Sequence, residues 1–126
     1  MLWHPNDTDL ISIHTDACEY GMGVIVSQKI LGVDRPIGFY SKIFTDSERK
    51  RPILHKEIHA VYFGIQKARN LVYNRYFRVF TDNAPARSIF SSEISNPVIA
   101  RYQLALDGFD FEIFTHLAVK MLVLIS

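Results

Sequence analysis

Two segments of this chain end in the same way, with an apolar, strand-like run that closes in Thr-Asp. One reads Ile-Ser-Ile-His-Thr-Asp from Ile11 to Asp16, and the other reads Phe-Arg-Val-Phe-Thr-Asp from Phe77 to Asp82. Apolar and polar residues alternate in the first run, which is the period of a half-buried strand. If the two strands lie parallel and adjacent, joined by a right-handed crossover, both aspartates reach the same edge of the sheet. Ligands of α/β proteins bind at such an edge.

Two further strands are predicted close to the first one. A β-branched run from Val24 to Val26 follows a predicted turn at residues 20–23. Residues 36–44 follow a predicted loop at residues 29–34, and they have the composition of a third strand. The three strands are expected to form an antiparallel meander.

A helix between the two Thr-Asp strands is the clearest predicted element. Its apolar residues recur at alternating steps of four and three, which gives one continuous stripe that packs on a sheet: Leu54, Ile58, Val61, Ile65, Ala68 and Val72. Glu57 lies about 60 degrees from the centre of this stripe on a helix of 3.6 residues per turn. We therefore expect Glu57 at the border between the buried face and solvent, pointing toward Asp16 and Asp82.

The last third of the chain predicts three more elements and a tail. Residues 84–90 indicate a short helix, and Asn96 with Pro97 is typical of the first positions of another helix. Residues 109–115 alternate as a final strand. The tail at residues 117–126 is apolar and carries no helix-capping residue.

Composition predicts one domain in a reducing compartment. The chain has 126 residues, of which 48% are apolar, enough for one core spanning residues 10–126, while residues 1–9 are predicted to be a linker or fragment edge. The single cysteine, Cys18, excludes an internal disulfide framework, and no signal segment is present, so we expect a cytoplasmic or nuclear location. No apolar run approaches the roughly 20 residues of a membrane-spanning helix, and no membrane partner is expected.

Charge does not decide the class of partner. The formal net charge is +1, and the locally clustered basic residues fit a solvated helix face as well as a phosphate-binding track: Arg49, Lys50, Arg51, Lys56, Lys67, Arg69, Arg75 and Arg78.

Three carboxylates carry the predicted chemistry. Asp16, Glu57 and Asp82 are oxygen ligands, which suit a hard divalent cation such as magnesium, and such a site fits metal-assisted hydrolysis of a phosphodiester. The alternative is that both aspartates only begin turns and that Glu57 is a surface charge. The chain contains no His-Glu-x-x-His motif, cysteine pair or Gly-rich phosphate loop, which argues against a zinc site or a nucleotide triphosphatase.

Five motifs in order resemble the ribonuclease H domain of gypsy-type retroelement reverse transcriptases, over about residues 11–116. They are His-Thr-Asp-Ala-Cys-Glu-Tyr-Gly-Met-Gly-Val-Ile-Val-Ser-Gln, Pro-Ile-Gly-Phe-Tyr-Ser-Lys-Ile-Phe-Thr, His-Lys-Glu-Ile-His-Ala-Val, Phe-Arg-Val-Phe-Thr-Asp-Asn and Phe-Asp-Phe-Glu-Ile.

The resemblance implies a ribonuclease H-like α/β fold, with three antiparallel strands followed by parallel strands in a mixed five-stranded sheet and with flanking helices. It implies an endonuclease that cuts the RNA strand of an RNA–DNA hybrid, in a polyprotein that also holds the polymerase domain of a reverse transcriptase. Four acidic residues of that family hold two Mg²⁺ ions, or Mn²⁺ in their place. The first three fall on Asp16, Glu57 and Asp82.

The fourth acidic position departs from the family pattern. It falls on Ile125 without a gap or on Ser126 with one gap, and neither residue offers a carboxylate. The domain is therefore expected to be truncated or divergent at its last helix. Three interpretations stay open: an active nuclease with three of four acids, a non-catalytic remnant that binds nucleic acid or protein, and a structural connection domain of the same fold.

Overall fold

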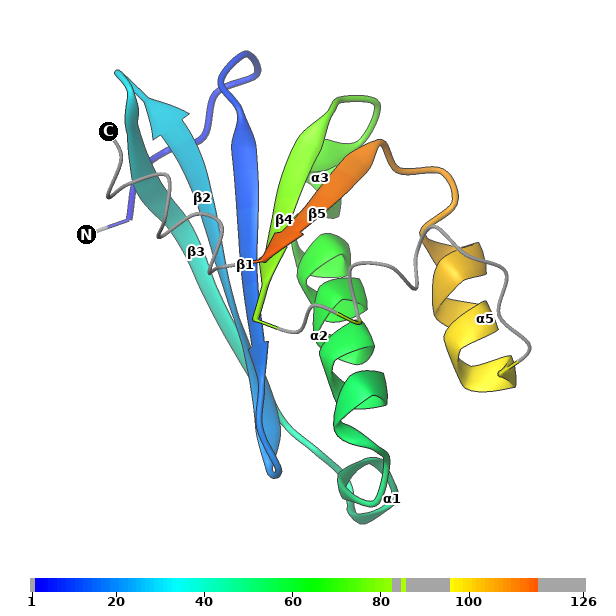
Figure 1. Ribbon diagram of the computed structural model, residues 1–126. Coiled ribbons are helices and arrows are strands. Elements are labelled where there is room, and N and C mark those ends of the chain that lie inside the picture. Colours follow the sequence, from blue (N-terminus) through cyan, green and yellow to red (C-terminus); the bar gives the residue numbers. More distant parts are fainter. Residues whose placement is uncertain (1, 83–84, 86–95, 116–126) are drawn as a thin grey trace.

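A mixed five-stranded sheet organises the computed structural model, which describes residues 2–82, 85 and 96–115. The strand order is β3-β2-β1-β4-β5, where β1 pairs antiparallel with β2, β2 antiparallel with β3, and β4 parallel with both β1 and β5 (Figure 1). The strands are β1 (Ile11–Ala17), β2 (Gly21–Ile30), β3 (Val33–Ile43), β4 (Phe77–Thr81) and β5 (Phe111–Thr115). The predicted meander followed by parallel strands is confirmed.

The helices that the structure describes lie on one side of this sheet. They are α1 (Asp46–Arg49), α2 (Ile53–Lys67), α3 (Arg69–Val72) and α5 (Pro97–Ala105). Figure 1 shows α2 between the sheet and α5, and α2 contacts β1, β2 and β4. The short helix predicted at residues 84–90 and the apolar tail, with Ile125 and Ser126, lie outside the described residues apart from Pro85.

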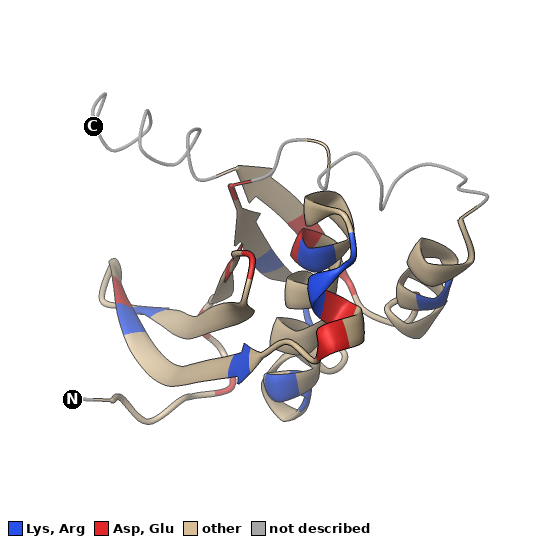
Figure 2. Cartoon of the chain, turned by 90° about the horizontal axis from the view of Figure 1, so that it is seen from below, with Lys and Arg blue, Asp and Glu red and all other residues tan. Residues whose placement is uncertain are grey.

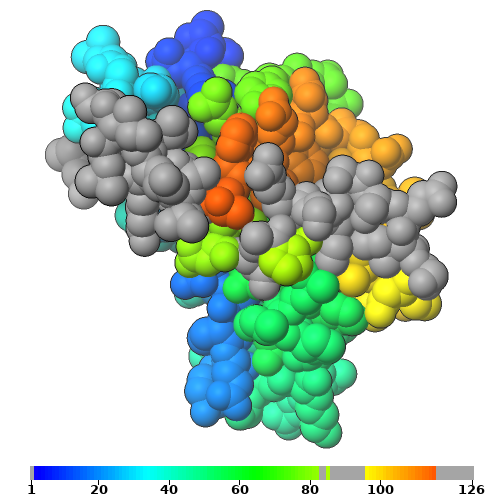
Figure 3. Space-filling view, viewed as in Figure 1, coloured from blue at the N-terminus to red at the C-terminus, as the bar shows by residue number. Residues whose placement is uncertain are grey.

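Both turns of the meander are shorter than predicted. Residues 21–23, expected in a turn, belong to β2, and the chain reverses over residues 18–20. The predicted loop at residues 29–34 contracts to Leu31 and Gly32, whose φ angles of 54° and 78° form a tight hairpin turn. The β1–β2 turn, in blue, lies beside the first half of α2, in green (Figure 3).

Helix α2 ends earlier than its apolar stripe. Ala68 leaves the helical conformation with φ −94° and ψ 7°, and the short α3 follows. Ile58, Ile65 and Val72 are nevertheless all fully buried, so the stripe predicted the core-facing side correctly across the break.

A close approach between α2 and the sheet sets the thickness of the core. A Cβ atom on Gly64 would lie 2.8 Å from Ile13 Cγ2 and 3.1 Å from Val24 Cγ1. Only glycine permits this separation without a shift of the helix. Ile13, Val24 and Val61 belong to the main hydrophobic cluster that fills the space between the helix and the strands.

The predicted start of α5 is confirmed. The Asn96 side chain accepts hydrogen bonds from Val98 N and Ile99 N at 2.9 and 3.4 Å, and Pro97 occupies the first helical turn. Ile99 then packs with Ile58 of α2, which attaches α5 to the central helix.

The N-terminal segment is anchored to the domain by Gln28. This side chain is fully buried in β2, accepts a bond from Asn6 N at 2.9 Å, and donates to Asn6 O at 2.8 Å and to Asp9 O at 2.9 Å. Arg75 also donates to both main-chain oxygens. Residues 6–9 are thus part of the folded unit; the predicted domain boundary at residue 10 stays a prediction.

Charged residues of both signs are interspersed over strands and helices (Figure 2). Several of the basic residues noted in the sequence have partners inside the domain: Arg75 in the N-terminal segment, Lys56 at the β1–β2 turn, and Arg49 over the ring of Tyr20. Among the described residues, no helix is long and apolar enough to cross a bilayer.

Candidate active site

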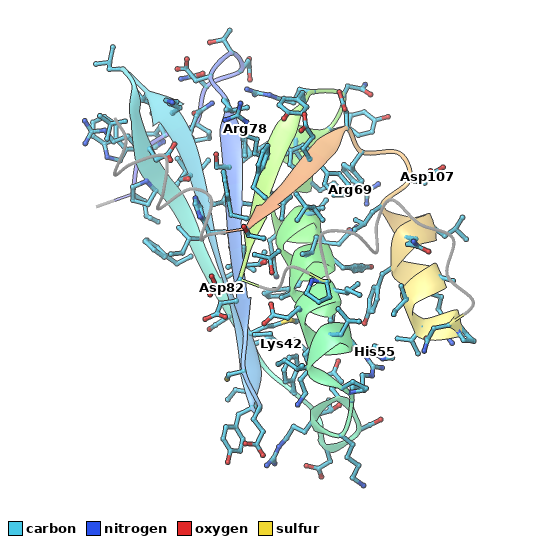
Figure 4. All side chains as sticks on the ribbon, viewed as in Figure 1. Lys42, His55, Arg69, Arg78, Asp82 and Asp107 are labelled. Carbon is cyan, nitrogen blue, oxygen red and sulfur yellow. The ribbon has the colours of Figure 1, made fainter. Side chains whose placement is uncertain are left out.

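The parallel pairing of β1 and β4 brings the two aspartates together. His14 is paired with Phe80, so Asp16 and Asp82, each two residues further on, lie next to each other at the same edge of the sheet. Asp16 is exposed near the end of β1, and Asp82 is exposed directly after β4, as Figure 4 shows for Asp82. Their convergence agrees with the prediction from the repeated Thr-Asp ends.

Asp16 and Asp82 line one pocket of about 560 Å³. Its other lining residues come from the three antiparallel strands: His14, Thr15, Gly23, Val24, Ile25, Phe39, Tyr40 and Ser41. The His14 ring stacks on Phe80, with centroids 4.7 Å apart. The pocket is therefore lined by aliphatic and aromatic side chains together with two carboxylates.

Glu57 approaches this edge from α2, and its burial differs from the prediction. It is only 5% exposed, so it is neither a border residue nor a surface charge. The close packing of α2 on the sheet at Gly64 holds this helix face against the ends of β1 and β4. The Glu57 carboxylate accepts hydrogen bonds from Thr81 Oγ1, at 3.4 Å, and from the Ala17 N–H.

The environment of Glu57 disfavours its ionised form. Burial, and after it the negative charge of Asp16, raises the pKa of Glu57 to about 7, while the hydrogen bonds from Ala17 and Thr81 act in the opposite direction. Asp82 also raises this pKa. Both aspartates thus act on Glu57, and a cation placed near these carboxylates would favour the ionised form of Glu57.

The donor atoms suit a hard cation, although they do not form a finished coordination shell. Within residues 2–82, 85 and 96–115, no group of three or more His, Cys, Asp or Glu side chains is arranged so that it could hold a metal ion. Mg²⁺ takes one or two carboxylates and completes its shell with water and substrate phosphate. Asp16 and Asp82 are exposed and could supply these carboxylates, whereas Glu57 is buried.

The threonines of the two Thr-Asp ends are neighbours of the candidate site that sequence patterns did not single out. Thr15 donates to Phe80 O at 3.2 Å and so links β1 to β4, while Thr81 donates to Glu57. Both are buried on the α2 side of the sheet. Strand alternation predicts this placement, because the residue before each exposed aspartate must face the other side.

His59 lies in a separate cluster. Its ring stacks between Phe44 and Tyr102, with centroid distances of 5.9 and 5.4 Å, and Nδ1 lies 3.7 Å from Glu48 Oε2. Burial lowers the pKa of His59 despite that carboxylate. It is a packed structural histidine.

Comparison with known families identifies the domain. The family described as "RNase H-like domain found in reverse transcriptase" matches residues 6–109. The chain belongs to this family. The resemblance deduced from the five motifs is thereby confirmed.

Relatives of this ribonuclease H-like domain are polyproteins of transposons. The chain is 26% identical over 113 residues to the Retrovirus-related Pol polyprotein from transposon 412 of Drosophila melanogaster, and 30% identical over 119 residues to the Transposon Tf2-3 polyprotein of Schizosaccharomyces pombe. Each match covers 90% of this chain and 9% of the polyprotein. The chain thus spans about a tenth of the length of these relatives.

A solved structure shows the same fold. The foamy viral protease-reverse transcriptase in complex with RNA/DNA hybrid superposes with a TM-score of 0.75 at 15% sequence identity, covering 90% of this chain and 16% of that one. At this identity the likeness shows the fold of the ribonuclease H-like domain alone.

Proposed function

We propose that this domain is a metal-dependent endonuclease that hydrolyses the RNA strand of RNA–DNA hybrids as part of a retroelement reverse transcriptase. The observation that carries the proposal is the convergence of Asp16 and Asp82 in one pocket, with Glu57 coupled to both. The family membership supports the substrate class, as does the foamy viral protease-reverse transcriptase, whose structure was solved in complex with an RNA/DNA hybrid. The polyprotein relatives support a polymerase domain as a partner in the same chain.

Asp16, Asp82 and Glu57 would contribute ligands to two divalent cations. Mg²⁺ is the expected ion, and Mn²⁺ is expected to substitute for it. Bound at these carboxylates, the metal supplies an activated water and a Lewis acid for the phosphate. Asp16 and Asp82 present their carboxylates to the pocket. Thr81 and the Ala17 N–H orient the Glu57 carboxylate, so that its oxygens stay directed toward the strand ends.

Recognition of the hybrid would rest on phosphate and 2′-hydroxyl contacts and would therefore show little sequence preference. Metal-assisted hydrolysis with the 3′ oxygen as the leaving group would leave a 5′ phosphate on the product.

The test is cleavage of a labelled RNA–DNA hybrid with Mg²⁺ or Mn²⁺. Asp16→Asn and Asp82→Asn are each expected to reduce cleavage by about 100-fold or more, because even loss of a group outside the first coordination shell costs about 10- to 100-fold. Asp107→Asn is the matched control, since this exposed aspartate follows α5, away from the pocket (Figure 4). Cleavage that is independent of metal, or equal in Asp16→Asn and the unaltered chain, would contradict the proposal.

A second candidate function follows from the resemblance to the family, which implies a fourth acidic position at Ile125 or Ser126, where this sequence has no carboxylate. In that case the domain binds the hybrid without cutting it. A folded chain that binds a labelled hybrid with no cleavage in Mg²⁺ or Mn²⁺ would establish this candidate in place of the first.

A further inference from the structure

Two consecutive residues of α2 hold the end of β1. The Glu57 carboxylate accepts from the Ala17 N–H, and Lys56 Nζ donates to Glu19 O at 3.3 Å. Neighbouring side chains of a helix point about 100 degrees apart, so Lys56 and Glu57 reach different residues. Their partners, Glu19 and Ala17, are two residues apart in the same segment. Helix α2 is thus hydrogen-bonded to the segment that directly follows Asp16.

This segment leads into the β1–β2 turn, which is also hydrogen-bonded to the strands beside it. Cys18 N donates to Gly21 O at 2.9 Å, and Phe44 N donates to Tyr20 O at 2.8 Å. These bonds fix the turn to β2 and to the end of β3, whereas Lys56 fixes it to α2, whose first half lies beside it in Figure 3. The second attachment joins the turn that follows Asp16 to the helix that carries Glu57.

Lysine is an unusual residue for this place. Lys56 is only 6% exposed, and an ammonium group removed from water loses hydration free energy. The carbonyl of Glu19 and the ring of Phe44, whose centroid lies 5.7 Å from Nζ, recover part of that loss. An apolar side chain of similar length fills the same space without the desolvation cost, so fold stability by itself does not require the ammonium group.

We propose that Lys56 is a positioning residue for the nuclease activity proposed above: by holding Glu19 O, it keeps the Ala17 N–H on the Glu57 carboxylate and so holds Glu57 in place relative to Asp16. This role rests on the proposed function. Lys56 acts through the main chain of the turn and does not touch the reacting atoms.

The test compares Lys56→Met with Lys56→Arg. Methionine keeps the length and the contact with Phe44 but has no donor, so we expect unfolding at the same urea concentration, an unchanged KM and a kcat lower by about 10- to 100-fold. Arginine keeps both charge and donor and is expected to restore most of the kcat. Lys67→Met is the matched control, because Lys67 lies on the same helix over the rings of Tyr40 and Phe63 and is exposed.

Amide hydrogen exchange gives a second readout that does not depend on cleavage. The Ala17 N–H is expected to exchange about 10-fold faster in Lys56→Met than in the unaltered chain, while core amides of β1 keep their protection. Unaltered Ala17 exchange and unaltered kcat in Lys56→Met would overturn the proposal, as would a Lys56→Arg variant as slow as Lys56→Met. If the unaltered chain does not cleave, the proposed function fails, and the exchange of Ala17 still decides whether Lys56 holds the turn.

Discussion

Glu57 is an acidic residue in a place where its charge is unfavourable. Its pKa is about 7 in the folded chain against an ordinary value of 4.5, chiefly because of burial and then because of Asp16. Below pH 4.5 the carboxyl is protonated in both the folded and the unfolded chain. Between pH 4.5 and 7 the unfolded chain releases this proton while the folded chain keeps it. The free energy of unfolding therefore falls as the pH rises through this window.

We therefore expect the free energy of unfolding to fall by up to about 3 kcal/mol between pH 4.5 and pH 7 through Glu57, and to level off above it. Glu57→Gln removes this titration and should flatten the curve, leaving the variant more stable than the unaltered chain at pH 8. Urea unfolding at pH 5 and pH 8 measures the difference, with the exposed Glu19→Gln as the control. An equal pH slope in Glu57→Gln would show that Glu57 is not the group responsible.

A bound cation should act on the same carboxylates. Because Mg²⁺ binds the ionised forms, adding it at pH 8 is expected to raise the Tm by an amount that grows with its concentration. Asp16→Asn should abolish most of this shift, whereas Asp107→Asn should keep it. A thermal shift equal in all three chains would indicate that the cation binds elsewhere.

At the scale of elements, the separation of α2 from the sheet places Glu57. The absent side chain of Gly64 lets the helix lie against Ile13 and Val24, and the same helix carries Lys56 and Glu57 to the ends of the strands. A wider separation would move these two side chains away from Ala17 and Glu19.

Gly64→Ala should therefore destabilise the fold, although alanine favours a helix. The added Cβ would lie 2.8 Å from Ile13 Cγ2. Ile13 is fully buried and β-branched, so its side chain has little room to move. We expect a net loss of about 1–2 kcal/mol, since overpacking costs about 1–3 kcal/mol and helix propensity returns at most about 1. In Gly108→Ala the new atom meets nothing within 4 Å, which makes it the control for urea unfolding. Equal losses in both variants would contradict the argument.

At the scale of the whole molecule, the N-terminal segment is hydrogen-bonded to the domain near Gln28, at the other end of β1 from Asp16. Gln28 and Arg75 come from distant parts of the chain, and both bind the main chain of Asn6 and Asp9. A buried amide that loses its partners costs more than the bonds themselves contribute.

A chain that begins at Leu10 should accordingly be less stable by about 2–4 kcal/mol, because it leaves the buried Gln28 side chain without these partners. A chain that begins at Pro5 keeps Asn6 and is the matched control. Thermal unfolding of the three lengths distinguishes the cases. If the Leu10 chain unfolds at the same temperature as the Pro5 chain, residues 5–9 are a linker after all.

Local sequence patterns determined much of this fold. The alternation in β1, the apolar stripe that ends with Val72, and the Asn96-Pro97 start of α5 each depend on neighbours within a few residues, and each was predicted correctly. The repeated Thr-Asp ends also predicted that Asp16 and Asp82 would meet, because parallel adjacent strands leave few alternatives.

Only the tertiary structure decided the surroundings of the candidate site. The burial of Glu57 depends on how closely α2 approaches the sheet, which follows from packing at Gly64 and not from the position of Glu57 on the helix. The bond from Lys56 to Glu19 and the burial of Gln28 likewise join residues far apart in the chain. Periodicity reports which face of an element is apolar, whereas the distances between elements arise when all side chains of the core are packed together.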